Sequence, residues 1–536
     1  MDIDVEVAVV GAGPCGITLA NLLGTYGVRT AVLDREPDVT PYPRAVAIDD
    51  ESLRTFQTAG VIDDVLPDLI LNAPIRYHSS TGRRLAHVGP SGRPYGWPRR
   101  NLFLQPVTEA SLRRGLERFD QVTLYPGAEV TGLDVGPDGV ALEAKTAGGG
   151  LAVRARYVVG ADGGRSFVRE RLGIPLVGET AASRWLVIDV ADDSLQTLYS
   201  AVYCDPDRPA MTIPLPYAHR RFEFKLLPGE DEQRVVTDEF VTGLLRPFYP
   251  SLPLPTIQGR RVYWHHSRIA ERFRSGPVFL GGDAAHLQPP FFGQGMNSGI
   301  RDATNLAWKL AAVTAGRAGE GLLDTYDTER RHHASAMVSF ATRVGRMYQP
   351  RNRATEIVRD GLFRGVQRVP GARDYILQMK YKPAPRYERG VVVPPARPDA
   401  ASPVGRLLGQ PFVTDAEGAR RRLDDVLGPV FAVIGLDGDP GRGLSADART
   451  LLTRMDARLW RVLPAAPGRR HGVDRDLVDG TGVLIDDEGG FRDLLLARPA
   501  ERILVVRPDR YVAAACGPDA LPEILTRLAA ALDLPY

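Results

Sequence analysis

The most constraining feature of the sequence is a glycine-rich turn that joins a short apolar strand to a helix near the N-terminus. Residues 5–10 are typical of a strand and are followed by Gly11, Gly13 and Gly16 in a G-x-G-x-x-G pattern. Residues 16–26 are typical of a helix, and residues 30–34 of a second strand. In such a unit the glycines allow a tight turn, close approach of backbone to a diphosphate and close helix–strand packing, while the helix N-terminus favours an anion. The pattern predicts an α/β fold with a Rossmann-like dinucleotide-binding unit; a purely structural glycine turn is the alternative.

An acidic residue stands where a dinucleotide fold binds a ribose. Asp34 ends the second strand 18 residues after Gly16, and it is placed to accept a hydrogen bond from a ribose hydroxyl. Its neighbour Arg35 is grouped with the cofactor-binding candidates. These residues do not separate FAD from NAD.

Two later motifs narrow the choice of cofactor. Residues 160–169 (GADGGRSFVR) follow a predicted strand and contain Asp162, while residues 282–286 (GDAAH) follow another strand and continue into 289–297 (PPFFGQGMN). Their order and their combination with the glycine-rich turn resemble the single-component FAD-dependent aromatic hydroxylases related to 4-hydroxybenzoate hydroxylase. The resemblance implies FAD as the resident cofactor and NADH or NADPH as a transient reductant.

The resemblance also assigns residues to the cofactor. Gly282 and Asp283 would contact the ribityl chain, and the backbone of Gly295, Met296 and Asn297 would face the pyrimidine edge of the flavin. Asp162 would serve the region shared by FAD and NAD(P)H, and Arg44 and Gln105 would lie near the flavin. A helix N-terminus at the pyrimidine edge would favour the negative charge of reduced flavin. Taken singly, each residue is also compatible with an ordinary helix cap or turn.

Further blocks narrow the resemblance to one branch of the family. Residues 42–55, 96–106, 204–209, 220–224 and 507–514 are similar to hydroxylases of 3-(3-hydroxyphenyl)propionate and 3-hydroxycinnamate. This similarity implies ortho-hydroxylation to a 2,3-dihydroxy product, with NAD(P)H and O₂, through a flavin C4a-hydroperoxide. Pro290, Phe291 and Phe292 are expected to form apolar walls of the substrate site. That segment and Met296 depart from the family pattern, which keeps open a larger polycyclic or polyketide phenol; a flavin-binding interaction protein without turnover is a more distant alternative.

Several polar residues are candidates for direct contact with the substrate. Asp49, Tyr203 and His286 are candidates for the group that favours the phenolate, and each has an alternative role as helix cap, core residue or turn residue respectively. A substrate carboxylate needs a cation. Arg208 and Arg221 are the candidates for it, with surface or fold-stabilising roles as the alternative.

The resemblance and the strand pattern together predict three domains. We expect a discontinuous FAD-binding domain at 1–71, 106–180 and 265–385, interleaved with a substrate-binding antiparallel sheet at 72–105 and 181–264. A linker containing Pro and Gly at 386–411 leads to a thioredoxin-like domain at 412–536. The last domain contains no C-x-x-C pair, and Cys516 stands alone in it. We therefore expect it to be structural or to form a dimer surface, without dithiol chemistry.

Composition restricts the partners. Lys and Arg number 67 against 65 Asp and Glu, a net charge of +2, so no nucleic-acid partner is expected. No apolar run is long enough to predict a membrane span. The three cysteines are far apart, which predicts neither a metal site nor a disulfide framework and favours a cytoplasmic protein. The expected partners are a small aromatic substrate, NAD(P)H and O₂, with a homodimer as a further possibility.

Overall fold

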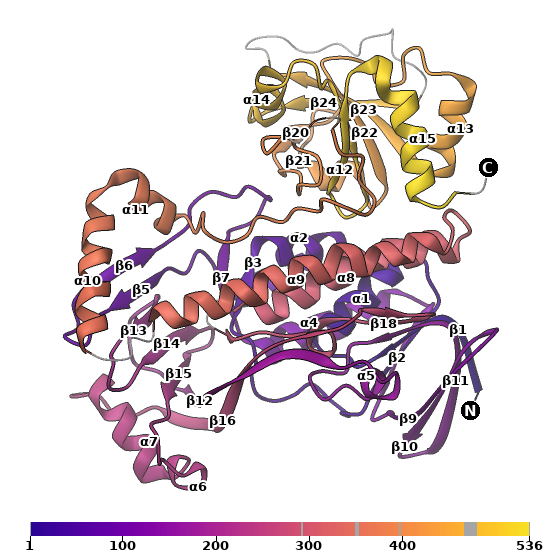
Figure 1. The fold of residues 1–536 in the computed structure, drawn as a ribbon. Coiled ribbons are helices and arrows are strands. Elements are labelled where there is room, and N and C mark those ends of the chain that lie inside the picture. The colour runs from indigo at the N-terminus through magenta and orange to yellow at the C-terminus, as the bar shows by residue number, and fades with distance from the viewer. Residues whose placement is uncertain are drawn as a thin grey trace.

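The structure is a computed structural model that describes residues 2–290, 293–348, 353–395, 397, 399–465 and 480–534. Within these residues, two sheets of eight strands and one of seven form three parts of the molecule, and a small sheet of three strands packs between the first two. In Figure 1 the first sheet lies at the lower right, the second at the lower left, and the C-terminal part above them.

The glycine-rich unit forms the centre of the first sheet. Its parallel strands stand in the order β18 (Val278–Leu280), β11 (Gly149–Gly160), β1 (Asp2–Val10), β2 (Thr30–Asp34) and β8 (Val122–Pro126). Antiparallel strands extend it, namely β17 (Arg274–Ser275), β9 (Glu129–Gly136) and β10 (Gly139–Thr146). Residues 7–10 are buried, as expected for the centre of a parallel sheet that is covered by helices. The predicted α/β fold is confirmed, and the carboxyl ends of the parallel strands meet at one edge.

Helices α1 (Pro14–Thr25) and α8 (Gln294–Thr314) pack against each other beside this sheet. Small residues permit the close approach, because a Cβ on Gly299 would lie 3.1 Å from the Gly282 Cα and 3.3 Å from the Cys15 Cβ. The two helices therefore begin close to the same strand edge, and both N-termini reach the same region.

The second sheet is almost entirely antiparallel. Its order is β19 (His286–Leu287), β16 (Thr256–Ala270), β12 (Leu176–Ala191), β15 (His219–Lys225), β14 (Ala210–Leu215), β13 (Ser200–Tyr203), β5 (Ile75–His78) and β6 (Arg84–Val88). Helices α6 (Glu232–Val235) and α7 (Asp238–Leu245) pack on it around Phe222. Strands β12 and β16 each span a position where the sequence predicts a domain boundary, 180/181 and 264/265 respectively, and their pairing shifts register between Thr180 and Arg184.

The three-stranded sheet lies between the two large sheets. It consists of β3 (Ala47–Asp49), β7 (Arg100–Phe103) and β4 (Leu69–Ile70). Helices α2 (Asp50–Thr58) and α4 (Gln105–Gly115) follow β3 and β7, and α3 (Ile62–Val65) follows α2. Asp49 and Arg100 are direct partners in the antiparallel register, so their side chains leave the same face of this sheet.

A run of helices connects α8 with the C-terminal part. They are the long helix α9 (Gly321–Tyr348) and the shorter helices α10 (Arg353–Arg368) and α11 (Pro370–Leu377). The two shorter helices pack on β6 and thus on the second sheet, although residues up to 385 were expected in the FAD-binding domain. The short helix α5 (Phe167–Arg171) follows β11.

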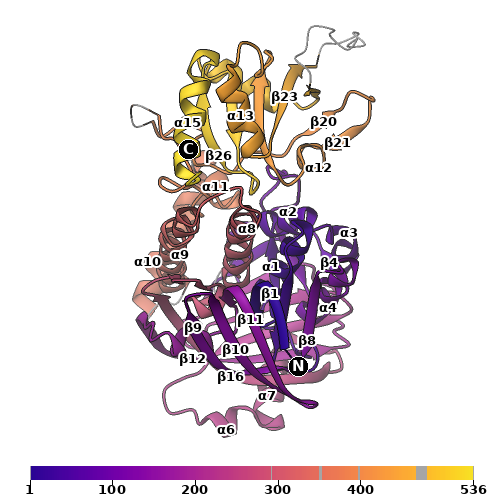
Figure 2. The ribbon, with the colours of Figure 1, turned by 90° about the vertical axis from the view of Figure 1, so that its right-hand side faces the viewer.

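The C-terminal part is a single sheet with helices packed on it. Its strand order is β21 (Arg420–Arg422), β20 (Phe412–Thr414), β24 (Thr481–Asp486), β23 (Ala457–Pro464), β22 (Phe431–Leu436), β25 (Ile503–Val506) and β26 (Val512–Cys516). The helices are α12 (Leu423–Leu427), α13 (Ala446–Arg454), α14 (Gly490–Ala497) and α15 (Leu521–Ala531). Figures 1 and 2 both show this part seated over α2, α8 and α9. Trp308 of α8 packs edge-on against Phe431 of β22 at 5.6 Å, within a core shared with the first sheet.

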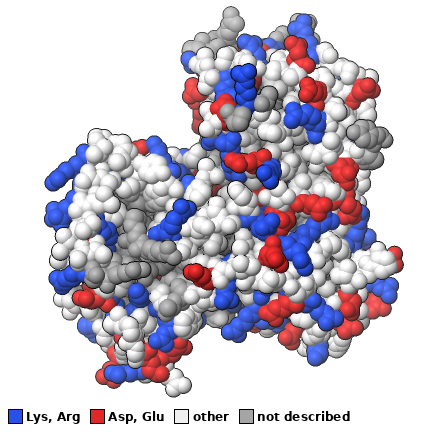
Figure 3. Space-filling view, in the orientation of Figure 1, with Lys and Arg blue, Asp and Glu red and all other residues white. Residues whose placement is uncertain are grey.

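Charged side chains of both signs are interspersed over the face drawn in Figure 3. Within the described residues, no helix is both long enough and apolar enough to cross a membrane.

Candidate active site

A cavity of about 510 Å³ opens where the strand edge of the first sheet faces the second sheet. This volume is typical of a cofactor or small-ligand site. Its lining comes from the ends of β1 and β2, the first turns of α1, α2 and α8, the turn after β18, and strands β5, β13 and β14. Twelve of the predicted cofactor residues line it: Gly11, Gly13, Asp34, Arg35, Arg44, Gln105, Asp162, Gly282, Asp283, Gly295, Met296 and Asn297. Gly16 lies behind them in α1.

The three glycines of the first turn differ in what surrounds them. A Cβ on Gly11, whose φ is +101°, would lie 2.5 Å from the Ala161 carbonyl oxygen, and one on Gly16 would overlap the Gly11 carbonyl oxygen. A Cβ on Gly13 would meet nothing within 4 Å, because this residue faces the cavity at the N-terminus of α1. That N-terminus has no side-chain cap. Open space beside uncapped backbone N–H groups fits a diphosphate.

Asp34 is fixed beside this turn. Its Oδ2 accepts a hydrogen bond of 2.7 Å from the Ala12 N–H, and its Oδ1 accepts one of 2.9 Å from the Glu36 N–H. Arg113 lies 3.7 Å from the carboxylate and lines the same end of the cavity. The β2 end therefore presents an anchored acid to the cavity, at the place the sequence predicts for a ribose contact.

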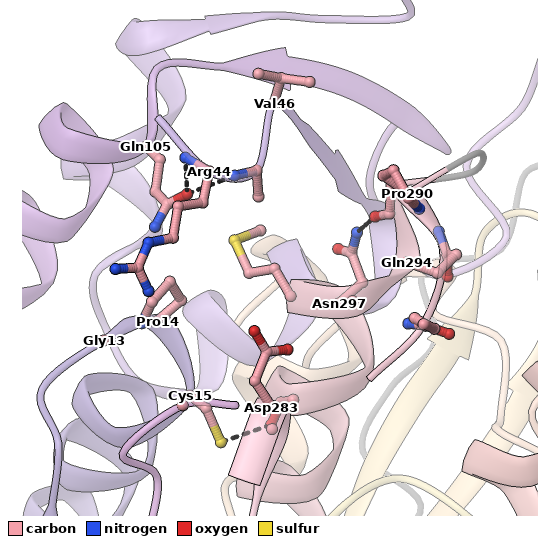
Figure 4. Close-up of a pocket in the computed structure, with 18 of the residues that line it drawn as sticks. Gly13, Pro14, Cys15, Arg44, Val46, Gln105, Asp283, Pro290, Gln294 and Asn297 are labelled. Carbon is pink, nitrogen blue, oxygen red and sulfur yellow. Dashed lines mark hydrogen bonds between the residues drawn. The ribbon is translucent and has the colours of Figure 1, made fainter. Parts of the chain in front are cut away.

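Gln105 holds the segment that carries Arg44. Its Oε1 accepts hydrogen bonds from the Arg44 and Ala45 N–H groups, at 2.8 and 2.5 Å, while its Nε2 donates to Glu109. Figure 4 shows the Arg44 side chain extending from this anchor towards Pro14 at the start of α1. A cation thus stands beside the uncapped helix N-terminus.

The turn after β18 is organised by a buried carboxylate that the sequence analysis missed. Asp302 of α8 accepts hydrogen bonds from the Gly282 N–H at 2.9 Å, from His286 Nε2 at 2.7 Å and from Arg330 Nε at 2.8 Å. Asp283 is then directed into the cavity (Figure 4). Desolvation raises the pKa of the Asp283 carboxyl, and the side chain is open to the cavity.

A second acid beside the cavity is incompletely bonded. The Oδ2 of Asp162 accepts a hydrogen bond of 3.1 Å from the Val168 N–H, whereas its buried Oδ1 has no partner among the described residues. Burial raises the pKa of this carboxyl as well. The free Oδ1 of Asp162 and the cavity-facing carboxylate of Asp283 can accept hydrogen bonds from the hydroxyls of a flavin nucleotide, while the glycine turn and the Arg44 cation fit its diphosphate.

The N-terminus of α8 is the second uncapped helix start at the cavity. Gly293, with φ +60°, precedes the helix, and Gly295 and Met296 of its first turn line the cavity. Asn297 braces this turn, because its Nδ2 donates to the carbonyls of Gly293 and Ala47 at 2.6 and 3.1 Å. Pro290 lines the cavity too, while Phe291 and Phe292 lie outside the described residues.

A buried cluster of charged side chains borders the cavity through Asp49 and Lys382. Arg301 of α8 bonds to both Asp49 and Glu51, and Lys382 lies 3.0 Å from Asp49 and 3.1 Å from Glu51. Asp49 also caps α2 by accepting the Ser52 N–H at 3.0 Å. Burial alone would raise the pKa of Asp49, but Arg301 and Lys382 hold it below its usual value. Asp49 is therefore an ionised, fully bonded carboxylate, which makes it a poor proton acceptor.

Its neighbour Asp50 has the opposite character. Asp50 lines the cavity, and its buried Oδ2 has no partner among the described residues. Burial and the adjacent Asp49 charge raise the pKa of Asp50 to about 8. Near neutral pH this carboxyl can therefore exchange a proton within the cavity.

The half of the cavity against the second sheet combines an apolar wall with cations. The wall is formed by Ile75, Val202, Met211, Ile213 and Met379, and the cations are Arg99, Arg100, Arg221 and Lys382. An aromatic ring fits the wall, and an anionic group fits the cations.

The structure does not bring all the predicted substrate residues to this half. Arg221 lines the cavity, but its guanidinium is bonded to Asp189. Arg208 pairs with Glu230 at 2.5 Å, the Tyr203 ring packs against neighbouring aromatic rings, and His286 is bonded to Asp302. Arg208, Tyr203 and His286 are absent from the described lining, because each side chain is committed to a contact outside it.

Six residues whose roles depend on long-range pairing could not be identified as site residues from the sequence alone. They are Asp50, Arg99, Arg100, Arg301, Asp302 and Lys382. The one local signal is the adjacent pair Arg301–Asp302 inside a helix that is otherwise rich in apolar residues, since charges in a buried helix need partners.

The glycine turn, the two uncapped helix N-termini and the carboxylates that face one cavity define a flavin-nucleotide-binding protein. Residues 4–341 match the model of a family described as FAD binding domain, and residues 405–531 match one described as HcaD C-terminal domain.

Named relatives make the class more specific. The chain is 46% identical over 510 residues to the 3-(3-hydroxy-phenyl)propionate/3-hydroxycinnamic acid hydroxylase 2 of Burkholderia vietnamiensis, covering 95% of this chain and 93% of the relative. It is 44% identical over 536 residues to the corresponding hydroxylase of Mycolicibacterium smegmatis, covering 99% and 94%. The crystal structure of aklavinone-11 hydroxylase with FAD and aklavinone superposes with a TM-score of 0.78 at 27% identity, covering 99% of this chain and 100% of that one. The chain belongs to this FAD-binding family of flavin-dependent hydroxylases.

Proposed function

We propose that this enzyme hydroxylates 3-(3-hydroxyphenyl)propionate or 3-hydroxycinnamate ortho to the phenolic hydroxyl, giving the 2,3-dihydroxy product. The observation that carries the proposal is 46% identity, over nearly the whole chain, to a hydroxylase named for these two substrates. The apolar wall and the cations in one half of the cavity support an anionic aromatic substrate. NADH or NADPH is the proposed reductant, and O₂ the oxygen donor.

The residues around the glycine turn are proposed to hold FAD. Gly13 and the N-terminus of α1 receive the diphosphate beside Arg44, Asp34 receives a ribose hydroxyl, and Asp283 receives hydroxyls of the ribityl chain. The first turn of α8 faces the flavin ring, where its backbone N–H groups stabilise negative charge. When bound, FAD takes a hydride from NAD(P)H and, with O₂, supplies the oxygen atom for transfer.

The protein residues have three tasks in the reaction. Ile75, Val202 and Ile213 hold the aromatic ring and exclude water, which protects a reactive oxygen donor from side reactions. Asp50, through its unpartnered Oδ2, accepts the phenolic proton as the ring is oxygenated. Asp49 keeps α2 in position through its bond to the Ser52 N–H and its ion pair with Arg301.

Product identification tests the function. The FAD-loaded enzyme is incubated with 3-(3-hydroxyphenyl)propionate, NADH or NADPH and O₂, and the product is identified by mass spectrometry and NMR. The 2,3-dihydroxy acid in near-stoichiometric yield with NAD(P)H is expected. NAD(P)H oxidation that yields only hydrogen peroxide contradicts the proposal, and turnover of a polycyclic phenol instead selects the larger-substrate alternative.

We propose further that the C-terminal part is a thioredoxin-like domain without dithiol chemistry, and that the chain has three domains, with α10 and α11 belonging to the substrate-binding sheet domain. Cys516 of β26 is a buried, free thiol, and burial raises its pKa to about 11, so it is a poor nucleophile at neutral pH. The fully buried pairing of Arg507 with Glu329 supports a structural role for this part.

A homodimer and a cytoplasmic location remain proposals. Ile357, Val358 and Leu362 of α10 are 71%, 73% and 66% exposed, and they give this helix an apolar outer face suited to a second copy of the chain. Light scattering of the wild type and of Leu362→Asp tests the dimer: conversion of a dimer to a monomer supports this face, and a wild-type monomer contradicts it.

A further inference from the structure

The cavity contains a cation that no carboxylate neutralises. Arg100, at the start of β7, is half-buried and lines the cavity. Its guanidinium donates to the Ala73 carbonyl at 2.6 Å and to Ser200 Oγ at 3.0 Å, both of which are neutral acceptors. Within the described part of the chain, Arg100 makes no ion pair within 4.0 Å. Burial lowers the pKa of Arg100 to about 10, as expected for a positive charge enclosed without a counter-ion.

Two of the neighbouring cations, Arg221 and Lys382, differ from Arg100 in this respect. Arg99 also has no ion pair among the described residues, but it donates to the Gln378 carbonyl at 2.7 Å, whereas Arg100 is bonded to Ser200 beside the apolar wall. Arg221 is paired with Asp189 through two nitrogens, at 2.8 and 3.0 Å. Lys382 bridges Asp49 and Glu51. These charges are consumed within the protein, so neither needs an anion from a ligand.

The position of Arg100 suits one end of an elongated aromatic ligand. Its partner Ser200 begins β13 and pairs in register with Ile75, which belongs to the apolar wall. On its other side Arg100 is the register partner of Asp49, so it lies next to the strand end that leads into Asp50. A ring packed on the apolar wall therefore has a guanidinium close to it.

We propose that Arg100 binds the carboxylate of the substrate and thereby selects arylpropanoates and arylacrylates over uncharged phenols. The two bonds to Ala73 and Ser200 fix the guanidinium plane and leave further N–H donors, and a guanidinium binds a carboxylate through two parallel hydrogen bonds. This assignment rests on the proposed function, and it places the anchor on β7 instead of at Arg208 or Arg221.

The test compares one ligand with and without its charge. Binding of 3-(3-hydroxyphenyl)propionate and of its carboxamide to the FAD-loaded, oxidised enzyme is followed through the change in flavin absorption, for the wild type, Arg100→Gln and Arg84→Gln. Arg84 lies exposed at the start of β6 and serves as the matched control. We expect Arg100→Gln to raise the Kd of the acid about 10- to 100-fold and that of the amide by less than about threefold. Arg84→Gln should change neither value.

Two results would overturn the assignment. One is an equal loss of affinity for acid and amide in Arg100→Gln; the other is an unchanged Kd for the acid together with a raised KM for NAD(P)H, which would assign Arg100 to the reductant. If Arg100→Gln does not retain FAD, Arg100→Lys replaces it, and an intermediate, acid-specific loss is then expected because the charge remains and the planar fork is lost.

The wild type separates this inference from the proposed function. If the wild type forms the 2,3-dihydroxy product but binds acid and amide equally, the anchor is wrong and the function stands. If it forms no such product, the function fails, whichever ligand it binds.

Discussion

Two groups of buried charges in this protein differ in how they are neutralised. Where the C-terminal part meets α8 and α9, Glu329, Arg507, Lys309 and Asp509 form a closed group: Glu329 lies 2.7 Å from Arg507 and 2.8 Å from Lys309, and Arg507 is also bonded to Asp509. The first three side chains are fully buried. At the cavity, by contrast, charged or ionisable groups such as Arg100 and Asp50 keep unpaired atoms or unneutralised charge.

The difference separates structural charges from charges that await a ligand. Transfer of an ion from water into protein is costly unless a partner compensates for it, so a closed group is stable by itself, whereas an open one is costly until a ligand completes it. Removing a member of the closed group should therefore reduce stability. Removing a member of the open group should reduce binding or turnover and leave the fold intact.

The largest effect is expected at Glu329. The substitution Glu329→Gln removes the negative charge that Arg507 and Lys309 share and leaves buried cations uncompensated, at a cost of about 3–5 kcal/mol. Thermal unfolding of the FAD-loaded protein is the measurement, and a clearly lowered Tm is expected. The control is Asp456→Asn, which removes a half-exposed pair between Arg317 and the C-terminal part and should cost under about 1 kcal/mol. Equal Tm values for the two variants would remove the distinction between closed and open groups.

Asp50 is expected to give the next largest effect, on turnover. Since Asp50 must be ionised to accept the phenolic proton, and its pKa is raised to about 8, the wild-type kcat should rise as the pH increases through about 8. Asp50→Asn should lower kcat about 100-fold and remove that rise, with the Tm unchanged or increased. Stopped-flow single-turnover rates at several pH values measure this. Asp64→Asn, at an exposed position on α3, is the control, and a pH profile that persists in Asp50→Asn would refute the role.

Asp283→Ala tests whether the cavity-facing carboxylate of Asp283 binds FAD. Asp283 faces the cavity beside Asp302, which already bonds to Gly282 and His286, so truncation removes a ligand contact without breaking that arrangement. We expect the Kd for FAD to rise about 10- to 100-fold, so that the yellow colour is lost on gel filtration. Asp302→Ala should lower the Tm as well, because it breaks a buried network. Full retention of FAD by Asp283→Ala would contradict the ribityl contact.

The sequence predicted the parts of the site that depend on local order along the chain. The glycine turn and the Asp283 turn could be located because strand, turn and helix follow one another within a few residues. Arg100 and Lys382 could not, because their surroundings are set by contacts with Ser200 and Asp49, which lie far from them along the chain. The packing of α10 and α11 on β6 likewise depends on tertiary contacts that local propensity does not encode.

Arg208 gives the smallest predicted effect and the sharpest check on sequence reasoning. The sequence offers Arg208 as a candidate cation for the substrate carboxylate, yet its guanidinium pairs with Glu230 at 2.5 Å and bonds to the Lys225 carbonyl, at a partly exposed site outside the described cavity lining. Arg208→Ala should therefore change the KM for 3-(3-hydroxyphenyl)propionate by less than about twofold and lower stability by under about 1 kcal/mol. Steady-state kinetics beside Arg100→Gln measure the contrast. A selective rise in KM for the acid in Arg208→Ala would mean that its pairing with Glu230 opens when the substrate binds, and the division between closed and open charges would then have to be drawn elsewhere.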